Sequence, residues 1–125
     1  MSKILEKKIA LVTGSSHGLG KRILTFLDAS GAKGLGFDSV ADADNLPDNW
    51  IFHQGDVSLE DDLSKAVEKI RDHFGRLDIV VANAGLVPPW RKVEVVDISE
   101  WDRVFAVNVR GVVLTMKQAV PLMKN

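Results

Sequence analysis

The chain has 125 residues, of which 46% are hydrophobic and 26% charged, a mixture typical of a single globular domain. Its formal charge of −1, with no basic block, argues against nucleic-acid binding. The absence of cysteine excludes disulfides, thiolate catalysis and Cys-ligated metals. Because there is also no signal peptide and no apolar run near the ~18 residues of a membrane span, we expect a cytoplasmic protein.

The first third of the chain predicts a strand, a glycine-rich turn and a helix. Residues 8–13 (KIALVT) are a short apolar run typical of a buried strand, and residues 14–20 contain three glycines. Residues 19–30 show helical spacing, and Gly31 is a stop signal for that helix. The residues at this spacing are Leu19, Ile23, Phe26 and Leu27.

Two further strands are predicted on either side of an acidic segment. Residues 33–38 (KGLGFD) mark a strand weakly, because its glycines are poor strand residues and suggest close approach of another backbone. Residues 39–49 contain Pro47 and predict at most a short helix. Residues 50–54 (WIFHQ) predict a third strand.

An amphipathic helix and a fourth strand follow. Ser58 and Asp61 have the spacing of a capping box, and Gly75 closes the predicted helix. Its apolar face comprises Leu63, Val67, Ile70 and Phe74. Residues 78–82 (DIVVA) predict a strand apolar enough to be covered on both faces.

The last third predicts a loop and a long helix. Residues 87–96 contain Pro88, Pro89 and Trp90, which either line a substrate pocket or pack as a loop against the sheet. A second capping pair, Ser99 and Asp102, precedes a helix over 100–123. The side chains expected toward the core are Trp101, Phe105, Val112, Met116 and Ala119.

This alternation predicts an α/β fold with a parallel sheet and helices on both faces. In such sheets ligands bind outside the carboxyl ends of the strands, where the glycine turn, Asp38 and residues 83–85 are expected. Neither His53 nor His73 has a second histidine at ligand spacing, so no metal site is expected.

The turn TGSSHGLG (13–20) predicts a pyrophosphate-binding loop. Glycine permits positive φ and close approach of backbone N–H groups, and the helix behind the turn adds unpaired N–H groups and a partial positive charge. Asp38 is placed to accept hydrogen bonds from an adenosine ribose and repels a 2′-phosphate, which favours NAD. A cationic His17 instead favours a 2′-phosphate, so NADP stays possible.

Four motifs stand in order along the chain. They are the TGSSHGLG turn, Gly55-Asp56-Val57 after the third strand, Ala82-Asn83-Ala84-Gly85 after the fourth, and Asn108 within FAVNVRG. In these motifs, and from about Lys7 to its end, the chain resembles the N-terminal part of the short-chain dehydrogenase/reductase family. The resemblance implies a Rossmann-like doubly wound parallel sheet of order 3-2-1-4, truncated after the fourth strand and its helix.

The resemblance also implies roles for individual residues. It places Gly14, Ser16, Gly18, Leu19 and Gly20 along the pyrophosphate and the cofactor entrance. Asp56 and Val57 are expected to border the adenine, and Asn108 to hold a water of the proton relay. The nicotinamide-side ribose is expected against Asn83, Ala84 and Gly85. From the residues alone, Asp56 as a helix cap and Asn83 as a turn former remain open.

The catalytic half implied by the resemblance is missing. In the family a tyrosine exchanges the substrate proton, a lysine lowers the pKa of that tyrosine, and a serine orients the substrate oxygen. The chain contains no tyrosine. We therefore expect residues 1–125 to be one incomplete NAD(P)-binding domain, cut short from an enzyme that transfers hydride between the cofactor and an alcohol or carbonyl substrate, and unable to turn over alone.

Two other functions remain open. One is a non-catalytic nucleotide-binding or regulatory module, and the weaker one is a methyltransferase, against which the ordered N-A-G and asparagine motifs argue. At full length we expect a homo-oligomer without nucleic-acid or membrane partners. In the truncated sheet residues 79–82 become an apolar edge, and the outer face of helix 100–123 is expected to expose apolar side chains.

Overall fold

The computed structural model describes residues 3–41 and 45–124. Its sheet contains four parallel strands: β1 (Ile9–Thr13), β2 (Lys33–Asp38), β3 (Trp50–Gln54) and β4 (Ile79–Val81). The strand order is β3-β2-β1-β4, which confirms the predicted topology. Part of the acidic segment 39–49 lies outside the described residues, and its described part contains no α-helix.

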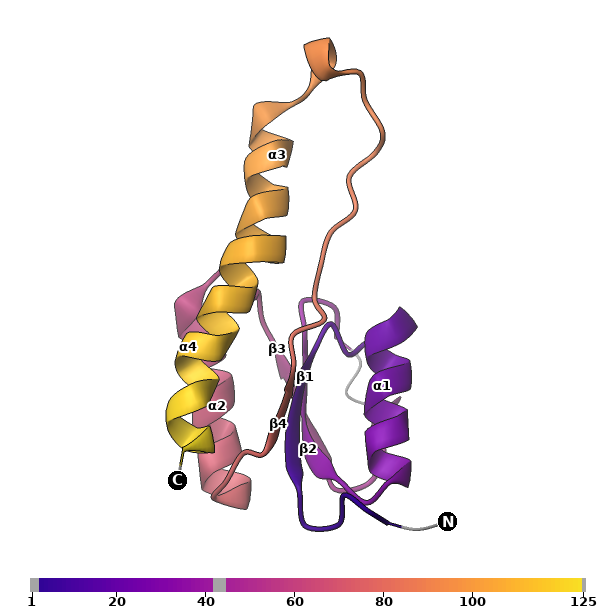
Figure 1. Cartoon of the computed structure of the whole chain (residues 1–125), viewed down its shortest axis with the longest axis vertical. Coiled ribbons are helices and arrows are strands. Elements are labelled where there is room, and N and C mark those ends of the chain that lie inside the picture. The colour runs from indigo at the N-terminus through magenta and orange to yellow at the C-terminus, as the bar shows by residue number, and fades with distance from the viewer. Residues whose placement is uncertain (1–2, 42–44, 125) are drawn as a thin grey trace.

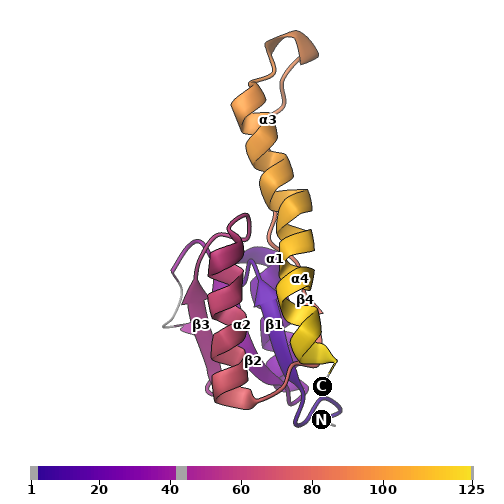
Figure 2. The same ribbon diagram turned by 90° about the vertical axis from the view of Figure 1, so that its left-hand side faces the viewer.

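Helices cover both faces of the sheet, as the alternating pattern predicts (Figures 1 and 2). Helix α1 (Gly18–Ala29) lies on one face, while α2 (Glu60–Phe74) and α4 (Gly111–Met123) lie side by side on the other. Each layer has its own apolar core. The core under α2 and α4 includes Leu11, Leu35, Phe37, Leu63, Ile70 and Leu114. The core under α1 includes Val12, Leu24, Leu27 and Trp50.

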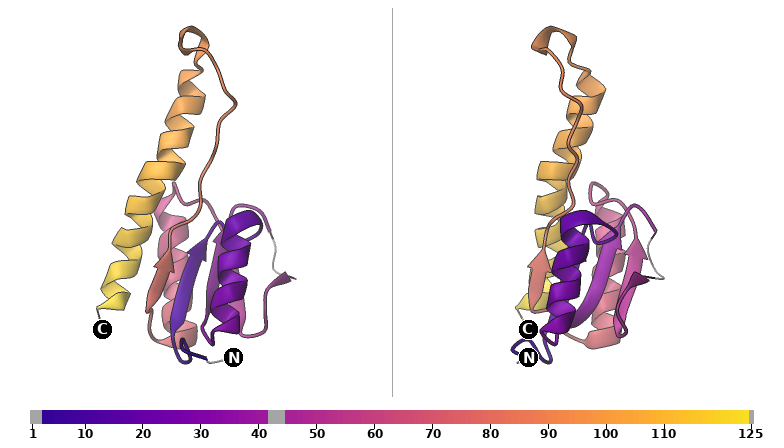
Figure 3. Two further views of the ribbon diagram at one scale, coloured as in Figure 1. Left: turned by 45° about the vertical axis from the view of Figure 1, so that its right-hand side comes forward. Right: turned by 90° about the vertical axis from the view of Figure 1, so that its right-hand side faces the viewer.

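The last helix has three consecutive parts. Helix α3 (Ile98–Phe105) continues through a π-helical turn, η3 (Ala106–Arg110), into α4. Figure 3 shows α3 and the preceding loop, which contains the short 3₁₀ helix η2 (Val93–Val95), projecting beyond the carboxyl ends of the strands. We call residues 86–105 the arm. Within the described residues, no helix is long and apolar enough to cross a membrane.

The apolar faces of two helices differ from the predicted ones. In α1 the residues that meet the sheet are Gly20, Leu24 and Leu27, with Ile23 partly buried against the same core; Leu27 and Ile23 were predicted. Leu19 and Phe26, also predicted, are 67% and 71% exposed. The small residue at position 20 lets the helix approach the first turn closely, and this contact sets its rotation.

In the last helix, Trp101, Phe105 and Met116 are exposed, contrary to prediction, while Ala119 is buried as predicted and Val112 is half-buried. Trp101 and Phe105 belong to α3, which projects away from the sheet (Figure 3). The buried residues are Val107, Gly111, Leu114, Thr115, Ala119 and Leu122. The wider π turn shifts the helical phase by about one residue, so the α-helical period does not continue across it.

Both predicted capping pairs are wrong, although the predicted helices exist. Helix α2 follows Leu59, which makes no side-chain cap, and Ser58 bonds to Asp56 instead. Helix α3 is capped by the Asp97 carboxylate, which accepts from the N–H groups of Ser99 and Glu100 at 3.0 and 3.3 Å. The predicted closure of α2 at Gly75 is confirmed by its left-handed φ of 74°.

Strand β4 is shorter and less buried than predicted. It has three residues, all half-buried, because it pairs with β1 on one side only and forms an edge of the described sheet. Val80 packs against the core under α2 and α4, while Ile79 and Val81 pack against the core under α1, so the strand is covered on both faces as predicted. The expected apolar edge is also present.

Candidate functional site

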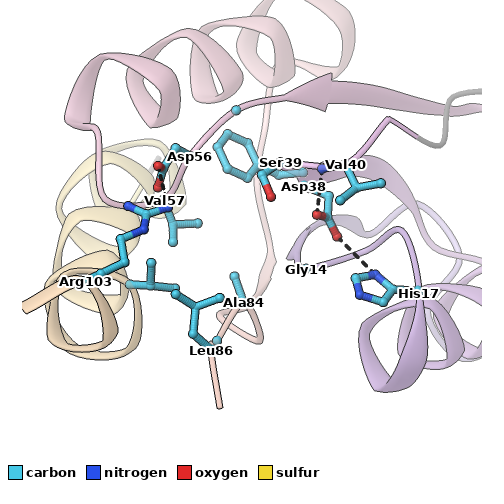
Figure 4. A pocket seen from close by; sticks show the side chains of 14 residues that line it. Gly14, His17, Asp38, Ser39, Val40, Asp56, Val57, Ala84, Leu86 and Arg103 are labelled. Atoms are coloured by element: carbon cyan, nitrogen blue, oxygen red, sulfur yellow. Dashed lines mark hydrogen bonds and ion pairs between the residues drawn. The ribbon is translucent and has the colours of Figure 1, made fainter. Parts of the chain in front are cut away.

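A cavity of about 240 Å³ opens at the carboxyl ends of the strands. In Figure 4 its labelled side chains form two groups that face each other, with Asp38 and His17 on one side and Asp56 and Arg103 on the other. Ala84 and Leu86, which follow β4, lie between the two groups. The strands bring these residues together because their parallel order places all four carboxyl ends at one edge.

The glycine turn presents an open helix N-terminus. Helix α1 begins at Gly18, and the side chain of the preceding His17 makes no cap. The first turn of α1 contains no acidic residue to compete for an anion. Gly18 has a φ of 59°, and a Cβ built on it meets nothing within 4 Å. The turn therefore combines positive electrostatic potential with free space, which fits a phosphate group.

The other two glycines of the turn fix its shape. A Cβ on Gly20 would lie 2.0 Å from the carbonyl oxygen of Gly14 and 2.5 Å from Asn83 Nδ2. Only glycine at position 20 lets α1 approach the turn this closely. Asn83 Nδ2 donates to the Gly14 carbonyl at 3.3 Å, and the N–H groups of Asn83 and Ala84 both donate to Thr13 Oγ1 at 3.0 Å. Asn83 thus joins the end of β4 to the glycine turn.

Asp38 is buried, and both of its carboxylate oxygens are hydrogen-bonded to backbone, one in the turn and one just after β2. Its side chain is 7% exposed, and its two carboxylate oxygens accept from the N–H groups of Ser16 and Val40 at 2.9 and 3.0 Å. Ser16 Oγ donates to the Val40 carbonyl at 2.6 Å. His17 is exposed, and its Nδ1 lies 3.8 Å from Asp38 Oδ2. The carboxylate therefore reaches the cavity in a fixed orientation.

Asp56 is held by two partners on the opposite side of the cavity. Its Oδ1 accepts from the N–H and Oγ of Ser58 at 2.9 and 2.7 Å, and its Oδ2 accepts from Arg103 Nη2 at 2.8 Å. Burial raises the pKa of Asp56, but hydrogen bonds from Ser58 and Arg103 outweigh it and hold the pKa below its usual value. Asp56 is therefore a carboxylate acceptor at neutral pH.

Asn108 belongs to the π-helical turn and bonds to the loop after β4. Its Nδ2 donates to the Leu86 carbonyl at 2.8 Å, and its Oδ1 accepts from the Leu86 N–H at 2.7 Å. Gly85 lies beside it, because a Cβ there would be 3.3 Å from Asn108 Oδ1. Asn108 is exposed in the structure, and both polar atoms of its amide are paired with backbone. Its expected role toward a water stays a prediction.

Of the predicted site residues, the turn glycine Gly14, His17, Asp38, Asp56, Val57, Ala84 and Gly85 line the cavity. Asn83 and Gly20 lie behind this lining and shape it, while Leu19 is exposed next to the turn. Sequence reasoning missed Arg103, which lies 47 positions from Asp56. Helical spacing offers no signal for such a pairing, because the contact depends on how α3 is placed over the sheet.

The arm carries a second cavity of about 310 Å³. Pro88 and Pro89 line it together with Trp101 and Phe105, whose rings are 4.2 Å apart between centroids. Trp90 is 85% exposed and belongs to neither apolar core. Of the two readings of this loop, packing against the sheet is therefore wrong. Within residues 3–41 and 45–124, no cluster of His, Cys, Asp and Glu could hold a metal ion.

Comparisons with known proteins point to one family. The sequence model described as short chain dehydrogenase matches residues 8–125. The chain is 38% identical to (+)-borneol dehydrogenase 2 of Salvia officinalis, over 93% of this chain and 44% of that protein. It is 35% identical to xanthoxin dehydrogenase of Arabidopsis thaliana, over 98% of this chain and 47% of that protein.

A solved structure agrees with these sequences. The crystal structure of 3-ketoacyl-(acyl-carrier-protein) reductase from Brucella melitensis complexed with NADH matches with a TM-score of 0.89 and 36% identity, covering 94% of this chain and 51% of that chain. The chain thus spans about half the length of the relatives it matches.

Proposed function

This chain belongs to the short-chain dehydrogenase family, and we propose that it forms the cofactor-binding part of an NAD(P)-dependent oxidoreductase. The observation that carries the proposal is the cavity at the strand ends, which joins the open N-terminus of α1 to two carboxylates, Asp38 and Asp56. A dinucleotide has one diphosphate and two ribosides, and this arrangement offers it a helix N-terminus and hydrogen-bond acceptors. We treat residues 1–125 as one dinucleotide-binding domain.

The site residues divide by the part of the cofactor that each would hold. The diphosphate is assigned to the turn, by Gly14, Ser16, His17, Gly18, Leu19 and Gly20. The adenosine ribose is assigned to Asp38, and the adenine to Asp56 and Val57. The nicotinamide half is assigned to Asn83, Ala84 and Gly85, with Asn108 in the proton relay. Bound there, the nicotinamide ring supplies or accepts a hydride.

The preferred cofactor is NAD. The Asp38 carboxylate is buried and held by two backbone N–H groups, so it stays at the cavity wall and repels a 2′-phosphate. The ion-pair partner of Asp38 is the exposed His17, whose Nδ1 lies 3.8 Å from Asp38 Oδ2. A single side chain that is 78% exposed offers little compensation for a second phosphate, because solvent screens its interactions.

The substrate of the whole protein is proposed to be a small alcohol or carbonyl compound. The tyrosine that exchanges the substrate proton in the family has no counterpart within the 125 residues, because they include no tyrosine. We therefore propose that this chain binds the cofactor but does not by itself reduce or oxidise a substrate.

Calorimetric titration with NAD, NADP and S-adenosylmethionine tests the proposal. NAD is expected to bind, NADP to bind about tenfold more weakly, and S-adenosylmethionine not to bind. Asp38→Asn should bring the two nicotinamide cofactors close to equal affinity, since it removes the charge that opposes the 2′-phosphate. Selective binding of S-adenosylmethionine would reject the oxidoreductase assignment, and turnover of an alcohol by the purified chain would reject the claim that it lacks catalysis.

A further inference from the structure

We propose that Arg103 is a positioning residue that orients the Asp56 carboxylate toward the exocyclic amine of the adenine. Arg103 would thereby contribute to selection of an adenine dinucleotide from a position on the arm. The inference rests on the proposed function, since it concerns the same cavity. Arg103 does not itself contact the cofactor in this proposal.

The contacts form a closed ring of three side chains. Arg103 Nη2 donates to Asp56 Oδ2 and Arg103 Nη1 donates to Ser58 Oγ, both at 2.8 Å. Ser58 Oγ in turn donates to Asp56 Oδ1 at 2.7 Å. The planar guanidinium thus bonds directly to one Asp56 oxygen, and the Ser58 hydroxyl links it to the other. Such a fork sets the plane of a carboxylate, which a single ammonium donor does not.

The ring sits where the adenine is proposed to bind. Arg103, Asp56 and Val57 all line the main cavity, and Figure 4 shows the Arg103 guanidinium beside the Asp56 carboxylate. Ser58 is 5% exposed and supports the pair from behind. The Arg103 side chain is 48% exposed, so its removal leaves the apolar core intact.

The backbone at Asp56 is held independently of Arg103. Its N–H donates to Asp62 Oδ2, on the first turn of α2, at 2.9 Å. Loss of Arg103 therefore frees the Asp56 side chain without releasing the segment that carries it. This separation predicts a change in adenine recognition rather than a collapse of the site.

The test compares NAD with its analogue in which hypoxanthine replaces adenine and an oxo group replaces the amine. The wild-type chain should prefer NAD by about tenfold. Arg103→Met should reduce this preference about fivefold and leave affinity for the analogue nearly unchanged. Asp56→Asn should abolish the preference, and adding Arg103→Met to it should change little more, because the two residues act as one unit. Arg103→Lys should restore part of the preference.

A matched control exists on the same arm. Arg91 pairs with Glu100 through two hydrogen bonds and has a side chain 40% exposed, but it lies on the second cavity. Arg91→Met should therefore leave the preference for NAD at its wild-type value. An equal loss of affinity for NAD and the analogue in Arg103→Met would show a merely structural role and overturn the proposal.

A measurement without cofactor gives a second readout. In an NMR pH titration of the side-chain carboxyl carbons, Arg103→Met should raise the pKa of Asp56, while Arg91→Met should not. An unchanged pKa of Asp56 would overturn the positioning role even if NAD binds normally. By contrast, a wild-type chain that binds neither NAD nor the hypoxanthine analogue would reject the proposed function. A raised pKa of Asp56 in Arg103→Met would then still establish the coupling between the Arg103 and Asp56 side chains.

Discussion

At the amino ends of the strands, the carboxylate of Asp78 joins β1 to the segment that leads into β4. Its Oδ2 accepts from the Ile9 N–H at 2.8 Å, and Arg76 pairs with both of its oxygens at 2.6 and 3.0 Å. Arg76 holds the pKa of Asp78 below its ordinary value, against the opposing effect of burial, and the Ile9 N–H lowers it further. The carboxylate is thus bound more favourably in the folded chain than in the unfolded chain.

Asp78→Asn should lower the free energy of unfolding at neutral pH by about 1 kcal/mol, because Ile9 and Arg76 lose a charged acceptor. The pKa of Asp78 is lower in the folded state, so its stabilisation is complete above the ordinary value of 3.8 and is lost as the pH falls through the lower folded value. Urea unfolding at a series of pH values should therefore show wild type and variant converging in acid.

Glu68→Gln is the matched control for Asp78→Asn. Glu68 forms an ion pair with Arg71 at 2.7 Å, but both side chains are about half exposed on α2. Its removal should cost about 0.5 kcal/mol or less, since solvent screens surface pairs. A loss in Asp78→Asn no larger than this would contradict the assigned role of Asp78.

At the scale of the element, two helix ends each contain a glycine in the left-handed backbone region, but their surroundings differ. Gly18 at the start of α1 and Gly75 after α2 have φ values of 59° and 74°, and a Cβ on either meets nothing within 4 Å. An alanine at either position therefore carries conformational strain without a clash. Only Gly18 lies in the turn assigned to the diphosphate.

Gly18→Ala and Gly75→Ala should each destabilise the chain by about 1 kcal/mol, because both force an alanine into the left-handed region. Only Gly18→Ala should also weaken NAD binding, since its Cβ enters the space in front of the α1 N-terminus. Thermal unfolding and NAD titration of the two variants separate these effects. Equal NAD affinities would show that the open space at Gly18 is not part of the cofactor site.

Elements with strong local signals were predictable from the sequence, and the strand order followed from the family resemblance, but the rotation and placement of the last helix did not. The strands follow from short apolar runs, and the Gly75 closure follows from the residue type. The π turn has no comparable local signal, and it changes which side of the last helix is buried. The Arg103 contact likewise depends on backbone placement rather than on residue spacing. The Asp97 cap did carry a signal, because Asp97 and Glu100 have the spacing of a capping box. The glycine turn and Asp38 follow two short apolar strands, so their place at the cavity was predictable, while their roles toward a cofactor stay predictions.

At the scale of the whole molecule, the outer side of the last helix carries a row of exposed apolar residues. The row spans α3, η3 and α4 and comprises Trp101, Phe105, Val109, Val113, Met116 and Val120, each 43% to 54% exposed. This confirms the expectation of apolar side chains on that outer face. A row of this length on one helix face is unusual for a surface in contact with water only.

The chain should therefore self-associate with increasing concentration, as measured by sedimentation velocity. Replacing Val109 and Val113 with lysine should shift the chain toward the monomer, because two charges would have to be desolvated in the contact. Phe26→Lys is the control, since Phe26 is 71% exposed on α1 at the opposite face of the sheet. A wild-type chain that stays monomeric over the whole concentration range would contradict this prediction.

The bond between Thr13 and the segment after β4 also bears on the order in which the protein is built. Thr13 Oγ1 accepts from Asn83 and Ala84, about 70 positions further along the chain. During synthesis the glycine turn emerges early, yet its partner Asn83 exists only after two helices and three further strands have been made. Closing so long a loop is a late and entropically costly step. The nascent chain therefore completes the turn that is proposed to bind the nucleotide only when β4 docks, and a bound cofactor is expected to stabilise this late contact.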